Sequence, residues 1–243
     1  MKTHNSRHRQ SRFRLMAVAM IVSVAAAGLW GCGRGRADAN RLAVMLGVRP
    51  GMVVADVGAG GGGMTVVMAG LVGPKGRVFS TDINRRALAR IRRAVVAARL
   101  DNVTVIKASA SDTGLPANCC DAIFLSRVYH HLTDPADTNR SLLRALRPGG
   151  KLAVLDFRPT LLLWLWTPKG LPANRHGHGV DPVTVAGEVT HAGFEFLQAD
   201  DPWPGSWFIS SYCLLFEKPP QYVPPPPPAA APTPSAAGSA PPG

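Results

Sequence analysis

The sequence is poor in cysteine, in acidic residues and in aromatic residues. Four cysteines among 243 residues are too few for a scaffold held together by disulfides. Asp and Glu number 15 against 27 Lys and Arg, which leaves a formal net charge of +12. Such an imbalance by itself favours a nucleic-acid ligand. The 46% share of hydrophobic residues excludes a wholly disordered chain, and the length suits one domain with attached segments.

Part of the positive charge belongs to a targeting segment at the N-terminus. Five basic residues and no acidic ones precede an apolar run over residues 15–31: Lys2, Arg7, Arg9, Arg12 and Arg14. A basic segment followed by an apolar run of this length predicts that residues 1–31 are an export signal. The run ends Leu29-Trp30-Gly31-Cys32. This end resembles the bacterial lipobox, apart from Trp30, and the resemblance implies a lipid on Cys32.

Three interpretations of this start stay open: a cleaved lipoprotein signal, an uncleaved membrane anchor with an incidental cysteine, and a wrongly assigned start codon. The first two attach the chain to the membrane in the cell envelope, with the domain on the periplasmic side, because flanking positive charges stay inside. The third leaves the protein in the cytoplasm.

Removing the signal lowers the net charge from +12 by five, to +7. The remaining arginines cluster on one predicted helix, where a solvated basic face explains them: Arg85, Arg86, Arg90, Arg92, Arg93 and Arg99. No nucleic-acid-binding motif accompanies them. The sequence therefore predicts no nucleic-acid partner.

The C-terminal segment, residues 219–243, holds 11 of the 22 prolines and no charged side chain. Five consecutive prolines over residues 224–228 favour an extended polyproline helix. Such a composition cannot form a packed core, so it predicts a disordered tail. The tail serves either as a spacer or as a peptide ligand for a proline-binding domain.

The intervening residues 32–218 form the predicted domain. Short apolar runs alternate with helical patterns; we expect strands over residues 52–57, 77–81, 103–107, 122–126, 151–157, 194–199 and 207–217. The predicted helices cover residues 37–46, 62–71, 83–99, 135–146 and 182–192. Strand–helix alternation of this kind predicts an α/β fold, a mostly parallel sheet with helices on both faces.

A glycine-rich loop follows the first predicted strand directly, in the order Asp56-Val57-Gly58-Ala59-Gly60-Gly61-Gly62-Gly63. Glycines permit a tight turn and let a ligand approach the backbone closely. The spacing of Gly58, Gly60 and Gly63 also fits a dinucleotide-binding loop, so the glycines alone do not decide the ligand.

Five motifs in order resemble class I S-adenosylmethionine (SAM)-dependent methyltransferases. They are the Asp56 to Gly62 loop, Asp82 ending the second strand, Ala110-Ser111-Asp112, Asp121 opening the fourth strand, and the turn Leu146-Arg147-Pro148-Gly149-Gly150. The resemblance implies a Rossmann-like fold with seven strands, the last of them antiparallel. It also implies SAM as cofactor, bound by Asp56, Gly58, Gly60, Gly62, Asp82, Ile83, Ser111, Asp112 and Ser126.

The resemblance further implies a role for Tyr129, His130 and His131, which follow the fourth strand like the "YHH" step of bacterial methyltransferases. A histidine can accept the proton that a nucleophile loses. We expect one of the two histidines to face the pocket and the other to pack. Adjacent histidines rarely converge on one ion, and His176, His178 and His191 lack a diagnostic spacing, so no metal site is predicted.

The stretch after the fifth strand, residues 159–180, is predicted to cover the substrate. Its leucines and tryptophans, at residues 161–166, indicate a small-molecule or lipid-like substrate, contact with the membrane, or simply a packed helix. Asp156 and Arg158 either touch substrate or form a structural ion pair.

The sequence thus predicts a SAM-dependent methyltransferase acting on a small-molecule or lipid-like acceptor. One alternative is a non-catalytic envelope lipoprotein that retains the fold as a ligand-binding module. A nicotinamide oxidoreductase is a third, disfavoured by Asp56 and by the turn at Pro148.

Overall fold

A computed structural model describes residues 34–160, 169–172, 174–175, 178–205 and 210–222. The predicted export signal, the leucine- and tryptophan-rich residues 161–166, and the tail from residue 223 onward lie outside the described residues. Among the described residues, no helix is both long and apolar enough to cross a membrane.

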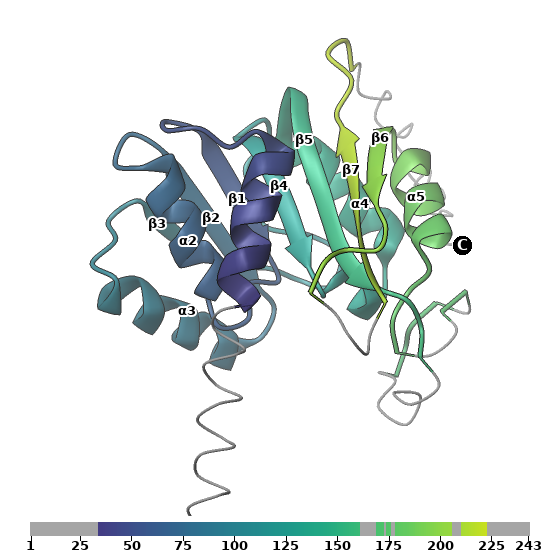
Figure 1. Ribbon diagram of the computed structural model, residues 1–243, viewed down its shortest axis with the longest axis horizontal. Coiled ribbons are helices and arrows are strands. Elements are labelled where there is room, and N and C mark those ends of the chain that lie inside the picture. The colour runs from purple at the N-terminus through teal and green to yellow at the C-terminus, as the bar shows by residue number, and fades with distance from the viewer. Residues whose placement is uncertain (1–33, 161–168, 173, 176–177, 206–209, 223–243) are drawn as a thin grey trace, which may run out of the picture.

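A single sheet of seven strands organises the domain, in the order β3-β2-β1-β4-β5-β7-β6 (Figure 1). Strands β1 to β5 pair in parallel, whereas β7 runs antiparallel to both of its neighbours. The predicted fold class is therefore confirmed. The strands are β1 (Val53–Val57), β2 (Arg77–Asp82), β3 (Val103–Lys107), β4 (Cys120–Ser126), β5 (Leu146–Phe157), β6 (Glu195–Asp200) and β7 (Ser211–Glu217).

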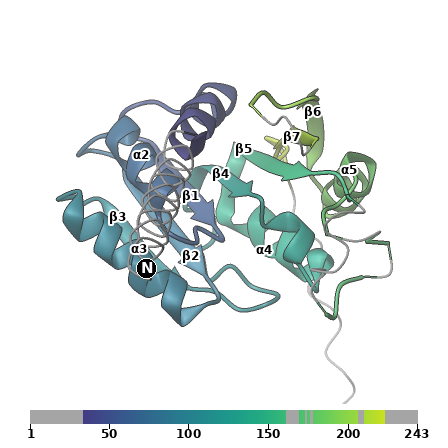
Figure 2. The ribbon, with the colours of Figure 1, turned by 60° about the horizontal axis from the view of Figure 1, so that its bottom comes forward.

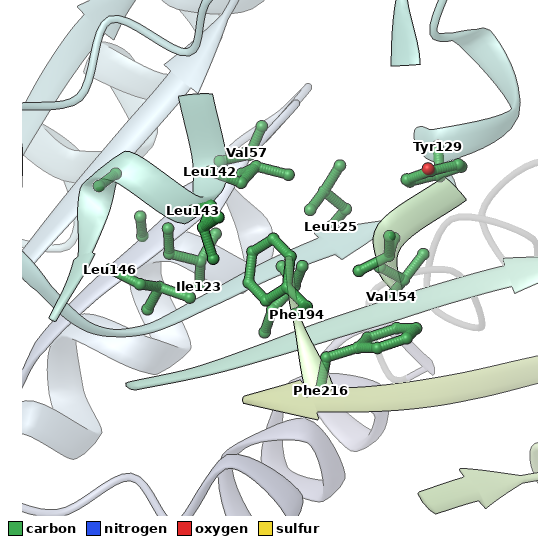
Figure 3. Packing of buried hydrophobic residues seen from close by; sticks show 14 of the residues in the cluster. Val57, Ile123, Leu125, Tyr129, Leu142, Leu143, Leu146, Val154, Phe194 and Phe216 are labelled. Carbon is green, nitrogen blue, oxygen red and sulfur yellow. The ribbon is translucent and has the colours of Figure 1, made fainter. Parts of the chain in front are cut away.

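Helices cover both faces of this sheet, as Figure 2 shows. They are α2 (Gly63–Val72), α3 (Arg85–Ala97), the short 3₁₀ helix η1 (Tyr129–His131), α4 (Pro135–Ala145) and α5 (Pro182–His191); residues 34–46 are helical as well. Helices α4 and α5 bury residues such as Leu142 and Val185 in one core cluster (Figure 3). Residues 34–46 and α2 bury Leu42 and Met68 against the opposite face.

The sequence explains why the central strands take these places. Strands β4 and β5 are buried along almost their whole length, as expected for parallel strands covered on both faces.

Helix α3 is capped at its N-terminus by Asn84, whose side chain accepts hydrogen bonds from the backbone N–H groups of Arg86 and Ala87. The arginines of α3 are exposed, in agreement with the predicted solvated face.

Several element boundaries differ from the sequence-based expectation. Strand β5 begins at Leu146 rather than at Lys151, because Leu146 already pairs with Cys120. Strand β4 correspondingly begins at Cys120. Tyr222, which lies within the predicted tail, packs against the core cluster that includes residues of α4 and α5.

The parallel strands β1, β2, β4 and β5 all point their carboxyl ends to one edge of the sheet. In open α/β sheets, ligands bind beyond this edge. The glycine loop, Asp82, η1 and Asp156 all lie at or directly after these strand ends.

Candidate active site

A pocket of about 290 Å³ opens at the carboxyl ends of β1 and β2. Residues from the glycine loop, the end of β2, the loop after β3 and the segment around η1 form its walls. They are Val57, Gly58, Thr81, Asp82, Ile83, Ala108, Ser109, Ala110, Asp112, Thr113, Val128, His131, Leu132, Thr133 and Thr138. Four of the nine predicted cofactor contacts therefore line this pocket: Gly58, Asp82, Ile83 and Asp112.

Asp82 is held in place by two backbone amides. The N–H of Gly60 donates to Oδ2 at 3.0 Å, and the N–H of Asn84 donates to Oδ1 at 2.8 Å. Each carboxylate oxygen can accept a further hydrogen bond. The arrangement gives the pocket a fixed acceptor for a pair of hydroxyl groups, and it places Gly60 behind Asp82 rather than in the wall.

Two glycines of the loop have no room for a side chain. Gly58 has φ +75°, and a Cβ there would lie 2.5 Å from Cγ2 of Val128. Gly62 has φ +78°, and its Cβ would lie 3.1 Å from Cα of Ile91 in α3. Both positions require glycine for backbone conformation as well as for space. Gly62 contributes to packing against α3 and does not line the pocket.

Asp56 lies beneath the glycine loop and does not line the pocket, and its contact with the cofactor stays a prediction. Its carboxyl is buried and accepts a hydrogen bond of 2.6 Å from the Thr65 hydroxyl in α2. Burial raises its pKa from 3.8 to about 7; the Thr65 hydrogen bond opposes this rise and the charge of Asp82 adds to it. Asp56 therefore connects β1 to α2 and shapes the loop.

Asp112 closes the other side of the pocket in a rigid turn. Its Oδ1 accepts from the N–H of Gly114 at 2.7 Å, and Arg144 donates to both oxygens at 3.1 Å. The Gly114 hydrogen bond and the Arg144 guanidinium hold the pKa of Asp112 below its ordinary value. Ser111 and Ser126 do not line the pocket, and their contacts with the cofactor stay predictions. Ser109 lines it, and its hydroxyl accepts a hydrogen bond from the N–H of Asp112 at 3.0 Å.

Tyr129 does not line the pocket, and its catalytic role stays a prediction. Its ring is fully buried within the core cluster (Figure 3). Its hydroxyl donates to Glu188 at 3.0 Å and accepts from Asn139 at 2.7 Å. Burial and the neighbouring Glu188 carboxylate raise the pKa of Tyr129. The hydrogen bond to Glu188 links η1 to α5. Arg175 donates two further hydrogen bonds of 2.9 Å to the same carboxylate.

The two adjacent histidines have different surroundings. His130 is 2% exposed, and its Nδ1 lies 2.8 Å from Oδ1 of Asp156 at the end of β5. His131 lines the pocket. Loss of water around His131, and its proximity to His130 and His178, lower its pKa to about 4. His131 is therefore neutral at pH 7 and is the one that faces the pocket, whereas His130 packs.

A third histidine joins this pair from a distant part of the chain. The ring of His178 lies 4.8 Å from that of His130 and 5.5 Å from that of His131, between centroids. One possible ligand atom from each of the three residues lies within 4.8 Å of the others. No sequence pattern indicates this group, because 47 positions separate His131 from His178. His176 lies outside the described residues, and His191 lies exposed at the end of α5.

Asp156 and Arg158 are engaged in structural contacts. Asp156 also accepts hydrogen bonds from the backbone N–H groups of His130 and Phe157, at 3.1 and 2.9 Å. Arg158 donates to both oxygens of Asp201, at 2.9 and 2.6 Å. Of the two open interpretations, the ion-pair one describes Arg158, and Asp156 acts on the site only through His130.

Residues 55–154 match the family described as "Methyltransferase domain". The chain is 36% identical over 120 residues to the ubiquinone/menaquinone biosynthesis C-methyltransferase UbiE of Vibrio cholerae, covering 48% of this chain and 45% of that protein. It is 39% identical over 113 residues to the Shewanella oneidensis protein of the same name, covering 46% and 45%. The chain thus spans less than half the length of these relatives.

Solved structures share the fold at lower sequence identity. A SAM-dependent methyltransferase from Aquifex aeolicus superposes with a TM-score of 0.61 at 23% identity, covering 74% of this chain and 89% of that one. A geranyl diphosphate methyltransferase in complex with SAM gives 0.60 at 14%, covering 75% and 85%. The [4+2]-cyclase SpnF gives 0.64 at 16%, covering 76% and 81%. Residues 55–154 therefore resemble a methyltransferase domain, and the described chain shares the fold of these solved structures.

Proposed function

We propose that this chain transfers the methyl group of SAM to a small, apolar acceptor. One observation carries the proposal: Asp82, fixed by the N–H of Gly60, lines the same pocket as Gly58 and Asp112. A carboxylate that can accept hydrogen bonds from hydroxyl groups, a glycine at position 58 without room for a side chain, and a second acidic turn together suit the parts of an adenosyl cofactor.

Each wall of the pocket has its own role in this proposal. Asp82 accepts hydrogen bonds from the two ribose hydroxyls. The turn at Asp112, with Ser109, borders the adenine ring. Gly58 lets the charged end of the cofactor approach the backbone. When bound, SAM supplies an electrophilic methyl group on a sulfonium, and the protein accelerates its displacement mainly by positioning the acceptor.

Of the three predicted catalytic residues, we assign the contact with the acceptor to His131. It lines the pocket and is neutral at pH 7, so it can accept a hydrogen bond from an acceptor hydroxyl. Tyr129 and His130 hold η1, and with it His131, in position through their contacts with Glu188 and Asp156 respectively. In this proposal neither of them touches the acceptor.

The acceptor class is proposed from the pocket and from the relatives. Val128 and Leu132, which flank η1 in the sequence, give the pocket an apolar wall beside His131. The curated relatives are named for C-methylation in ubiquinone and menaquinone biosynthesis. A hydroxylated aromatic ring with an apolar substituent fits both observations. Its methylation replaces a ring hydrogen: the S–CH₃ bond breaks, a C–CH₃ bond forms, and a proton leaves.

Calorimetric titration of the purified full chain with SAM, in mild detergent, tests the first step. We expect micromolar or tighter binding; absence of binding at high micromolar SAM would overturn the proposal. Mass spectrometry of a panel of hydroxylated aromatic and lipid-like acceptors then tests transfer. Binding of SAM without transfer to any member would support the non-catalytic module, and tight NAD binding without SAM binding would support the oxidoreductase.

We also propose that residues 1–31 act as the export signal, that Cys32 carries a lipid, and that residues 219–243 form a spacer. The basic-then-apolar order of the first 31 residues supports this. Fractionation with labelled fatty acid, comparing the native chain with Cys32→Ser, tests it. Label in both variants, or a soluble cytoplasmic product, would contradict the proposal. An envelope location would require a supply of SAM outside the cytoplasm.

A further inference from the structure

We propose that His130, His131 and His178 form a binding site for one divalent transition-metal ion beside the pocket. The three residues each offer a ring nitrogen, and these atoms lie within 4.8 Å of one another. Among the described residues, these three form the group of His, Cys, Asp or Glu side chains that lie close enough together to hold a metal ion. The proposal concerns metal binding alone and holds whether or not the chain transfers methyl groups.

His130 has the surroundings of a metal-binding histidine. Its ring is 2% exposed, and its Nδ1 is held by Asp156 at 2.8 Å. Among the described residues, its Nε2 is buried without a hydrogen-bonding partner. A buried polar atom without a partner costs free energy unless a ligand satisfies it. In known metal sites, a carboxylate that binds one histidine nitrogen orients the other nitrogen toward the ion.

The other two histidines come from separate parts of the chain, and both of their rings lie close to that of His130. His131 belongs to η1, and His178 lies in the segment before α5. The ring centroids of His130 and His131 lie 4.0 Å apart. His178 stacks on Phe157, with centroids 5.6 Å apart and planes 14° apart. Phe157 follows Asp156 in β5, so one strand end supports both the His130 and the His178 sides of the group.

The spacing requires only a small adjustment. Tetrahedral Zn²⁺ with bonds of about 2.0–2.1 Å holds its nitrogen ligands about 3.4 Å apart. The ligand atoms lie at most 4.8 Å apart, so closure moves them by no more than about 1.5 Å. His131 and His178 are less buried than His130 and can supply this movement by rotation. His130, fixed by Asp156, would stay in place.

The types of ligand limit which metal ions the site would bind. Three imidazoles and no carboxylate suit zinc, copper, nickel or iron and disfavour magnesium and calcium, which prefer oxygen. Three protein ligands leave a coordination position open, as in catalytic rather than structural zinc sites. Because His131 also lines the pocket, this position would border the space where an acceptor lies.

Equilibrium dialysis of the full chain against Zn²⁺, without a polyhistidine tag, tests the proposal. We expect one equivalent of tightly bound zinc, and loss of affinity of at least tenfold in His178→Asn and in His131→Asn. His191→Asn is the matched control, since His191 lies exposed on α5 away from the group; it should bind like the native chain. Substitution with Co²⁺ should give the intense visible absorption of a four- or five-coordinate site.

His130→Gln and Asp156→Asn probe the buried half of the site, and circular dichroism reports whether each variant folds. A folded Asp156→Asn should bind zinc about 10–100-fold more weakly and shift the Co²⁺ spectrum. Equal zinc binding by His178→Asn, His131→Asn and the control would overturn the proposal, as would no zinc bound at 100 μM. Asp82→Ala should retain zinc fully, which separates this outcome from failure of SAM binding.

Discussion

The carboxylate of Asp82 accepts the backbone N–H of Gly60 at 3.0 Å, across 22 positions of sequence. This bond joins the acid at the end of β2 to the glycine loop after β1. The end of β2 and the loop after β1 are neighbours because β1 and β2 pair in parallel, with Val57 opposite Thr81. Asp82 therefore fixes the glycine loop beside the pocket, and the proposed function gives its carboxylate the ribose hydroxyls as ligands.

Asp82→Ala should weaken SAM binding by about 1.5–3 kcal/mol, the range for hydrogen bonds to a charged group. Asp82→Asn should lose less, because its amide oxygen still accepts one hydrogen bond. Calorimetry on both variants measures the difference. Affinity unchanged in Asp82→Ala would refute a contact between Asp82 and the cofactor.

Gly58→Ala should abolish measurable SAM binding, because its Cβ would lie 2.5 Å from Val128 at a φ of +75°. Gly61→Ala is the matched control: a Cβ there meets nothing within 4 Å, and its backbone needs no positive φ. We expect Gly61→Ala to bind SAM within a factor of three of the native chain. Equal losses in the two variants would show that the loop tolerates no side chain anywhere, rather than closing on Val128.

The sheet and its ligand-binding edge could be predicted from sequence because both depend on local patterns. The apolar run of β1, the glycines after it and the acid at Asp82 follow one another along the chain. Parallel pairing then brings the strand ends together without further information. For this reason seven strands were expected within a few residues of their actual positions.

The roles of Tyr129 and the histidines could not be predicted, because they depend on partners far away in sequence. Glu188 lies 59 positions beyond Tyr129, and Asp156 lies 26 beyond His130. A tyrosine or histidine next to a strand end carries no sign of whether such a partner will bury it. The same holds for Asp56, where burial against Thr65, rather than sequence motif, decides that the carboxyl does not reach the pocket.

Asp56→Asn should make stability less dependent on pH. The pKa of Asp56 is raised on folding from 3.8 to about 7, so the folded state holds this proton more tightly than the unfolded state. The resulting stabilisation is complete below pH 4 and is lost as the pH rises to about 7. The shift corresponds to at most about 4 kcal/mol.

Urea unfolding of the cofactor-free protein at pH 4.5, 6 and 8 measures this effect. The stability of Asp56→Asn relative to the native chain should increase across the series. Asp101→Asn, at an exposed loop position, should show the pH dependence of the native chain. Parallel curves for the native chain and Asp56→Asn would mean that Asp56 is ionised at all three pH values.

Tyr129→Phe separates a structural tyrosine from a catalytic one. The change removes the hydroxyl that accepts from Asn139 and donates to Glu188, and it leaves buried polar atoms without partners. We expect a loss of about 1–3 kcal/mol in the free energy of unfolding. Because the ring remains in the core, SAM affinity and turnover should stay within about threefold below the melting range. Tyr222→Phe, at a partly exposed position, should change stability by less than about 0.5 kcal/mol. A fall in turnover of about 100-fold at unchanged stability would instead restore Tyr129 as an acid–base residue, because proton transfer by a positioned side chain contributes at least that much.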